Sequence, residues 1–278
     1  MEVLGVGLTH TGNRNLGDAL EILFKQSCHT FRDIEGNLDA WIIAVRKFYE
    51  THDFQPILDL TKDFRHFAGY PLCFFYEEMV KLNPKIKFIL TLTDEKVWLE
   101  AMLPMIKNLM IPDIIEAPLK NAKTPAEMLK MEKVKVKKKT LELFELILKH
   151  YMREVPDFDL EDESNLRILF RKHSREVKEK IPSENLLILD DPEEWAALCS
   201  FLKVPEPEHE DYPDGLYPPD DLEMHEDKIP MTIDDPQLVD NEGQDNERKS
   251  NVTAYVKMIG IFGLMAGVVG YYLYKKSK

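Results

Sequence analysis

Two glycines near the start of the chain, Gly7 and Gly12, have the spacing of a loop that holds phosphate groups. Gly7 lies near the end of an apolar, strand-like run over residues 3–8, and Gly12 lies before a helical pattern over residues 15–24. In a strand–turn–helix unit of this kind, the backbone N–H groups at the start of the helix point at an anion. The first helical turn adds its partial positive charge. The spacing therefore predicts an anion-binding loop, although the same glycines are also typical of an ordinary structural turn.

The charged side chains of this loop differ from those of a nucleoside triphosphate-binding site. Such a site has a lysine and a hydroxyl residue directly after the second glycine, and this chain has Asn13 and Arg14 there, followed by Asn15. His10 is the nearest cation inside the loop, and an imidazole with an ordinary pKa of about 6.5 is mostly neutral at neutral pH. The glycine spacing thus indicates the geometry of a phosphate-binding loop, whereas the side chains that usually neutralise the phosphate charge are not present in the usual positions.

The elements that follow alternate between helix and strand. This alternation predicts an α/β protein with a mostly parallel sheet flanked by helices in three layers, of the P-loop type. We expect strands over 3–8, 86–92 and 184–189, and helices over 15–24, 39–49, 55–67, 74–82, 95–110, 124–151, 164–180 and 192–201. Asp94 is expected to cap one helix, and Thr124 with Glu127 forms a capping-box pattern at another.

Charge is distributed unevenly along the 278 residues, whose formal net charge is −14. Sixteen acidic residues and a single lysine, Lys228, lie between 206 and 247, so the remainder of the chain is close to neutral. This balance argues against a nucleic-acid partner. Cys28, Cys73 and Cys199 are widely separated and predict neither a disulfide framework nor a zinc site, so no metal ligands are assigned.

A hydrophobic segment near the end of the sequence predicts a transmembrane helix. Residues 258–274 contain no charge, and the segment extended to 252–274 is long enough to cross a bilayer. Without a secretory signal peptide, the expected topology is a tail-anchored, single-pass protein with its folded body in the cytosol. Gly263 and Gly267 form a small-xxx-small pair that could join two such helices in a homodimer. The expected domains are a folded body 1–205, a disordered acidic tether 206–251, the membrane helix 252–274 and a basic tail 275–278.

Three ordered segments resemble the P-loop sulfotransferases that use 3′-phosphoadenylyl sulfate. The first family motif reads G-L-P-R-T-G-T-x-S-L and corresponds to residues 7–16. The second, I-L-T-x-R-D-x-x-x-W-x-x-S, corresponds to residues 89–101, and the third, around G-W-E-P-L-C-x-F-L, to residues 194–202. His173 resembles a residue of the helix that leads into the third segment. The resemblance implies a sulfotransferase fold over the body of the chain.

The resemblance also implies roles for individual residues. The first loop would bind the 5′-phosphosulfate, with His10 at the place of the basic residue that stabilises charge on the bridging oxygen. The arginine and serine that would hold the 3′-phosphate are replaced by Thr93 and Ala101. His29 stands where the family has a histidine after the first helix and is a candidate base for the acceptor hydroxyl. The candidate donor-binding residues are Gly7, Thr9, His10, Thr11, Gly12, Asn13, Arg14, Asn15, Thr93 and Ala101.

Three functions are compatible with these residues. The first is a membrane-anchored sulfotransferase that moves a sulfuryl group from 3′-phosphoadenylyl sulfate to a small-molecule hydroxyl or amine acceptor. The second, favoured by the substitutions at Thr93 and Ala101, is a catalytically inactive sulfotransferase-fold interaction module at a membrane. The third, a nucleotide kinase or hydrolase, is least favoured because the loop lacks the Lys-Ser/Thr pair and no acid other than Asp94 follows a strand where it could bind a metal.

Overall fold

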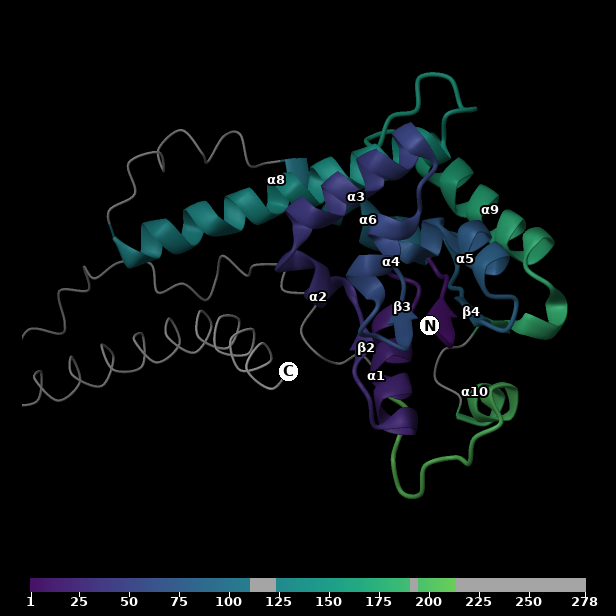
Figure 1. Ribbon diagram of the computed structural model, residues 1–278. Helices are drawn as coiled ribbons and strands as arrows, with labels where there is room; N and C mark the ends of the chain where they lie inside the picture. The colour runs from purple at the N-terminus through teal and green to yellow at the C-terminus, as the bar shows by residue number, and fades with distance from the viewer. Residues whose placement is uncertain (111–123, 191–194, 214–278) are drawn as a thin grey trace, which may run out of the picture. The chain divides into compact units, whose positions relative to one another are not determined.

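The computed structural model describes residues 1–110, 124–190 and 195–213. These residues form an α/β body around a sheet of parallel strands, whose order is β2-β3-β1-β4-β5 (Figure 1). The strands are β1 (Val3–Gly5), β2 (Cys28–His29), β3 (His66–Ala68), β4 (Lys87–Thr91) and β5 (Leu186–Leu189). Because β1 is central, the residues that follow it emerge between β3 and β4 at the carboxyl edge of the sheet.

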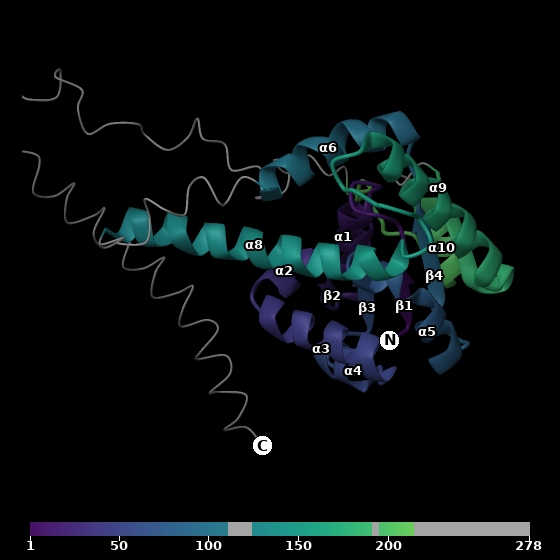
Figure 2. The ribbon, with the colours of Figure 1, turned by 90° about the horizontal axis from the view of Figure 1, so that it is seen from above.

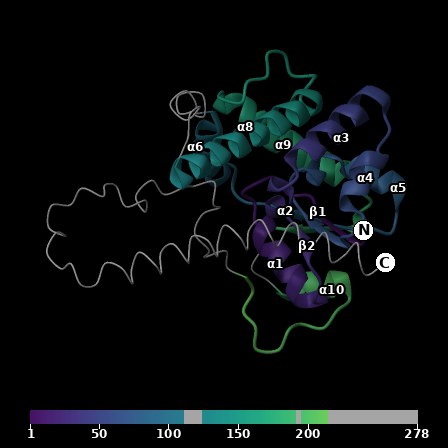
Figure 3. The ribbon, with the colours of Figure 1, turned by 60° about the vertical axis from the view of Figure 1, so that its left-hand side comes forward.

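Helices cover both faces of the sheet. They are α1 (Asn13–Phe24), α2 (Phe31–Glu35), α3 (Leu38–Thr51), α4 (Gln55–Thr61), α5 (Tyr76–Leu82), α6 (Glu95–Met110), α8 (Pro125–Tyr151), α9 (Glu163–Lys180) and α10 (Trp195–Leu202), with short 3₁₀ turns η1 (Leu72–Phe74) and η2 (Ser183–Asn185). Figure 3 shows α1 and α10 on one side of the strands and α3, α6, α8 and α9 on the other. Seen from above, α8 runs between α3 and α6 (Figure 2). The three-layer arrangement follows from this distribution.

The alternation of side chains along the strands supplies both hydrophobic cores. Leu4, Phe67 and Phe88 belong to the core beneath α3, α6, α8 and α9. Val3 and Ile89, one position away in their strands, belong to the core beneath α1 and α10. Successive residues of a strand point to opposite faces, so buried strands with helices on both sides are apolar throughout.

Most of the expected elements are present with small shifts at their ends. Helix α6 begins after Asp94, whose Oδ1 accepts hydrogen bonds from the amides of Lys96 and Val97 at 2.8 and 3.3 Å. Helix α8 begins after Thr124, and the capping box between Thr124 and Glu127 is formed in both directions. Both predicted caps are therefore confirmed.

The helix expected over 55–67 is wrong in its second half. Helix α4 ends at Thr61, and His66–Ala68 form β3, which pairs with both β1 and β2. Strand β2 was not expected either. Both strands are too short for a periodicity of two to be visible, and their pairing with β1 rather than local sequence keeps them extended.

The α/β fold with a parallel sheet flanked by helices is confirmed. The packed body continues past 205, because Tyr212 is buried in the core beneath α1 and α10, and the indole of Trp195 donates to the Glu210 carbonyl oxygen at 2.9 Å. In the part of the chain that the structure describes, no helix has the length and apolarity to cross a bilayer. The predicted membrane segment 252–274 and most of the predicted tether lie outside the described residues.

Candidate anion-binding site at the β1–α1 loop

The loop between β1 and α1 turns at two glycines, each needed for a different reason. A Cβ atom on Gly7 would lie 2.0 Å from the Thr91 Oγ1 and 2.8 Å from the Thr91 carbonyl oxygen, so β4 leaves no space for a side chain. Gly12, the N-cap of α1, has φ 98° and ψ 13°, in the left-handed region that favours glycine. The strand–turn–helix unit predicted from the glycine spacing is therefore formed.

Three consecutive carbonyl groups of the loop are hydrogen-bonded to side chains. The Asn13 Nδ2 donates to the Gly7 carbonyl oxygen at 2.9 Å and to the Leu8 carbonyl oxygen at 2.7 Å. The indole Nε1 of Trp98, from α6, donates to the Thr9 carbonyl oxygen at 2.8 Å. These carbonyl dipoles are held by protein donors, so the protein itself fixes the conformation of the loop before any ligand arrives.

Two buried threonines link the loop to β4. The Thr11 hydroxyl donates to the Leu8 carbonyl oxygen at 2.7 Å and lies 2.8 Å from the Thr91 hydroxyl. The Thr91 hydroxyl also lies 3.3 Å from the Asn13 Oδ1. Sequence reasoning did not assign Thr91 or Trp98 to the site. Both are constant letters of the family's second motif, T and W, which was the available signal.

The start of α1 presents backbone donors. The first intrahelical bond runs from the Leu16 amide to the Gly12 carbonyl oxygen at 3.0 Å, so the amides of residues 12–15 have no acceptor within the helix. Gly12 has no side chain to cap them, and the first turn contains no acidic residue. The amides at a helix start and the positive end of the helix dipole favour a bound anion at this position.

The basic candidates of the loop lie around this helix start. His10 is exposed and adopts a left-handed backbone conformation, with φ 65°. Arg14 and Asn15 are half-buried in the first turn of α1, and Thr9 is half-buried in the loop. The structure therefore gathers the predicted loop residues into one segment, in which Thr11 and Asn13 face the loop itself.

The second half of the predicted donor site carries no accessible positive charge at its own positions. Thr93 follows β4, and Ala101 lies on α6; both are half-buried, and neither side chain is cationic. Two guanidinium groups reach the start of α6 from α9, but both are paired with Glu95. The Arg167 Nη1 lies 2.7 Å from the Glu95 Oε1, and the Arg171 Nε lies 2.5 Å from the Glu95 Oε2.

This ion-pair cluster holds the Glu95 carboxylate ionised. Its hydrogen bonds from Arg171 and then Arg167 lower the pKa of Glu95 to about 2. Both arginines are thereby compensated by a carboxylate of the protein. The loop thus fits a phosphosulfate or phosphate group, whereas the positions expected to hold a 3′-phosphate do not offer the charge it requires.

The candidate base His29 lies in the hydrophobic core. His29 is 3% exposed, and burial is the main cause that lowers the pKa of its imidazole below the ordinary value. The ring stacks on Phe67 with centroids 4.4 Å apart, and it meets Phe64 and Trp41 edge to face at 4.4 and 6.2 Å. Among the described residues, its Nδ1 has no hydrogen-bond partner.

Strand register places His29 at a different depth from the loop. His29 pairs with Phe67, which pairs with Leu4, three residues before Gly7. At roughly 3.3 Å per residue, the loop begins about 10 Å farther along the strand direction, and two strand spacings separate β2 from β1. The structure brings the loop residues together but does not bring His29 to them.

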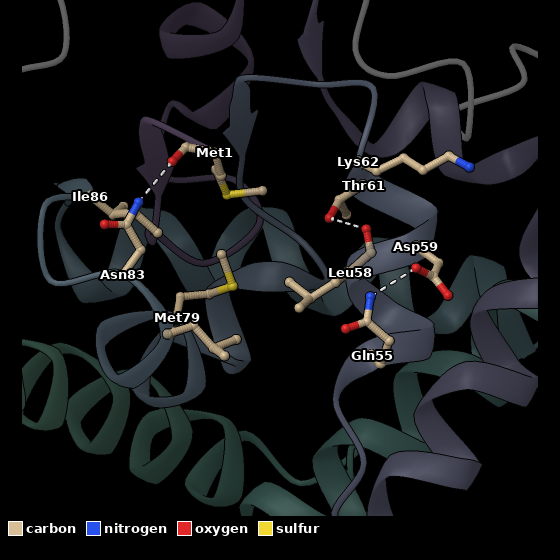
Figure 4. Close-up of a pocket in the computed structure, with 10 residues that line it drawn as sticks. Met1, Gln55, Leu58, Asp59, Thr61, Lys62, Met79, Asn83 and Ile86 are labelled. Carbon is tan, nitrogen blue, oxygen red and sulfur yellow. Dashed lines mark hydrogen bonds between the residues drawn. The ribbon is translucent and has the colours of Figure 1, made fainter.

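A pocket of about 250 Å³ lies at the opposite edge of the sheet (Figure 4). It is lined by methionine and aliphatic side chains with a polar rim: Met1, Gln55, Leu58, Asp59, Thr61, Lys62, Met79, Leu82, Asn83 and Ile86. These residues precede β1, β3 and β4, whereas the glycine loop follows β1. The pocket is therefore separate from the anion-binding loop.

Comparison with known proteins agrees with this geometry. A family model described as a sulfotransferase domain matches residues 2–215, which include the whole sheet and the glycine loop. A curated protein from Aspergillus versicolor, Ava biosynthesis cluster protein M, is 27% identical over 220 residues, which cover 76% of this chain and 79% of that protein.

Proposed function

Because the chain belongs to the sulfotransferase domain family, we propose that its β1–α1 loop binds the 5′-phosphosulfate end of 3′-phosphoadenylyl sulfate. The proposed activity is transfer of the sulfuryl group to a hydroxyl or amine of a small-molecule acceptor. One observation carries the proposal: the carbonyl groups of Gly7, Leu8 and Thr9 are held by Asn13 and Trp98, while the first-turn amides of α1 have no intrahelical acceptor.

Each loop residue has a distinct part in this proposal. The amides of residues 12–15 hold the anion, and His10 and Arg14 supply positive charge around it. Asn13 and Thr11 fix the loop by bonding to its carbonyl groups. The donor, when bound, supplies an activated sulfuryl group, and donors aimed at the charge that develops during transfer accelerate such a reaction.

Affinity for the donor is expected to be low. Replacing the family's arginine by Thr93 removes a charge-assisted hydrogen bond worth about 1.5–3 kcal/mol, which corresponds to about 10- to 150-fold in affinity. Ala101 has no hydroxyl to contribute. The chain should therefore discriminate poorly between nucleotides with and without a 3′-phosphate.

A second candidate function is a non-catalytic interaction module that retains the fold. The observation that favours it is the pairing of Arg167 and Arg171 with Glu95, together with Thr93 and Ala101 at the donor positions. This module would keep the body of a sulfotransferase without recognising the complete donor.

Titration calorimetry of the full-length protein separates these possibilities. We expect saturable binding of adenosine 3′,5′-bisphosphate, and less than tenfold weaker binding of adenosine 5′-monophosphate. The matched variant Gly12→Val, which places a β-branched residue at φ 98°, should bind neither nucleotide. Absence of binding by the wild-type protein at millimolar nucleotide would refute the donor-binding proposal.

Turnover is tested separately from binding. Release of adenosine 3′,5′-bisphosphate from 3′-phosphoadenylyl sulfate should rise when phenolic, alcoholic or amine acceptors are added. If the protein binds the nucleotide but releases no adenosine 3′,5′-bisphosphate with any of these acceptors, the non-catalytic module is favoured.

We further propose that residues 252–274 anchor the protein in a bilayer, with the body on the cytosolic side. The support is their length and the uncharged run 258–274. Resistance of the full chain to alkaline extraction from membranes tests the anchor.

Self-association in vesicles should fall in a Gly263→Leu, Gly267→Leu variant and persist in a Met265→Leu control, if the glycine pair joins two chains.

A further inference from the structure

A histidine of α9 binds the backbone directly before the glycine loop. The His173 Nε2 lies 2.7 Å from the Val6 carbonyl oxygen, across 167 residues of sequence. At this point β1 leaves the sheet: the Gly5 carbonyl oxygen accepts from the Gly69 amide, and the Val6 amide donates to the Ile89 carbonyl oxygen. The Val6 carbonyl group is therefore held by α9 rather than by a neighbouring strand.

The surroundings of the imidazole fix its protonation and its orientation. A carbonyl oxygen only accepts, so the His173 Nε2 carries a proton. Burial keeps the ring neutral, lowering the pKa of His173 to about 4. The ring is 1% exposed and is enclosed by the rings of Phe74, Tyr76 and Tyr151, with centroids 5.4, 6.0 and 5.8 Å away.

Helix α9, which carries His173, is itself tied to the helix that holds the other side of the loop. Arg167 and Arg171 of α9 pair with Glu95 in the first turn of α6, and Phe170 contacts Trp98 with ring centroids 5.0 Å apart. Trp98 in turn donates to the Thr9 carbonyl oxygen. One connected pair of helices thus holds the loop at Val6 and at Thr9, on either side of Gly7.

We propose that His173 is a positioning residue of the anion-binding loop. Its neutral Nε2–H group holds the Val6 carbonyl and sets the direction in which the chain leaves β1. The inference rests on the proposed function, because the loop it positions is the proposed site for the phosphosulfate group. His173 itself does not touch the anion in this role.

The variants His173→Phe and His173→Gln separate positioning from packing. Phenylalanine retains an aromatic ring in the same aromatic enclosure but has no donor, whereas the glutamine Nε2 can supply the donor. His66→Phe is the matched control: His66 is also 1% exposed and stacks on Phe24 at 4.3 Å, yet neither ring nitrogen has a hydrogen-bond partner among the described residues. His66 lies at the start of β3, away from the loop.

Amide hydrogen exchange of residues 6–16 in the nucleotide-free protein is the primary readout. We expect exchange to rise about fivefold in His173→Phe, the equivalent of one net hydrogen bond, and to return toward the wild-type rate in His173→Gln. His66→Phe should leave exchange of this segment unchanged. Equal loop exchange in folded His173→Phe and wild-type protein would overturn the proposal.

The same variants distinguish this inference from the proposed function. Affinity for adenosine 3′,5′-bisphosphate should fall about fivefold in His173→Phe and remain unchanged in His66→Phe. If the wild-type protein binds no nucleotide, the proposed function fails, but the exchange experiment still tests positioning. If His173→Phe does not fold, Trp98→Phe provides the second test, because it removes the hydrogen bond to the Thr9 carbonyl while keeping an aromatic ring. Unchanged amide exchange of residues 6–16 in Trp98→Phe would contradict the proposal that α6 and α9 together hold the loop.

Discussion

Replacing Gly7 by alanine should destabilise the protein through a collision that can be calculated from the structure. The added Cβ would lie 2.0 Å from the Thr91 Oγ1, 2.4 Å from the Thr11 Oγ1 and 2.8 Å from the Thr91 carbonyl oxygen. Thr91 is fully buried, so its side chain cannot move into solvent. The third contact is with backbone and cannot be relieved by a rotamer change. We expect Gly7→Ala to lower the free energy of unfolding by about 3 kcal/mol, the upper range for overpacking a core.

A double-mutant cycle identifies the source of this loss. Thr91→Ala removes the nearest colliding atom together with its hydrogen bonds to Thr11 and Asn13, and by itself should cost about 1.5 kcal/mol. The double variant should lose about 3 kcal/mol, because part of the collision is relieved while the backbone contact remains. The coupling is then about 1.5 kcal/mol in favour of the pair.

Chemical denaturation followed by circular dichroism measures these differences. The matched control is Gly36→Ala, at a glycine with φ −69° and no atom within 4 Å of the added Cβ. This control should match the wild-type protein or exceed its stability by up to about 1 kcal/mol. Additive losses at Gly7 and Thr91, or a stable Gly7→Ala protein, would refute the close approach of β4 to the loop.

Three further outcomes are expected. The contribution of His173 to the unfolding free energy should fall by about 2.5 kcal/mol as pH drops from 6.5 to 4, because the unfolded chain takes up a proton that buried, neutral His173 excludes. Denaturant titration at each pH measures it as the difference in pH dependence between the wild-type protein and His173→Phe. Thr93→Arg combined with Ala101→Ser should tighten binding of adenosine 3′,5′-bisphosphate at least tenfold in calorimetry, and an unchanged affinity would remove these residues from the donor site. His29→Phe should leave sulfuryl transfer unchanged, given the aromatic enclosure of that ring, whereas loss of turnover with retained nucleotide binding would identify His29 as the base.

Local sequence predicted the parts of the fold whose signals are local. The glycine turn before α1, the aspartate cap of α6 and the capping box of α8 each depend on residues within a few positions of one another. Strand β3 was missed because His66–Ala68 is a short segment that becomes a strand only by pairing with β1 and β2.

The candidate site, like the fold, was predictable only where its residues are neighbours in the sequence. The loop residues are consecutive, so their spacing indicated the site directly. Their supports are not consecutive: Thr91, Trp98 and His173 reach the loop from β4, α6 and α9. The candidate base His29 was predicted from its position after α1 in the sequence. That position does not reveal that His29 pairs with Phe67, well before the strand ends at which the loop lies.

The order of these supports along the chain has a consequence for biosynthesis. The ribosome makes the glycine turn before Thr91, Trp98 and His173, and the imidazole that holds Val6 comes last of these supports. The glycine loop is therefore synthesised before the side chains from β4, α6 and α9 that hold it. The final conformation of the loop therefore requires that the helix bearing His173 has been made and has packed against the body.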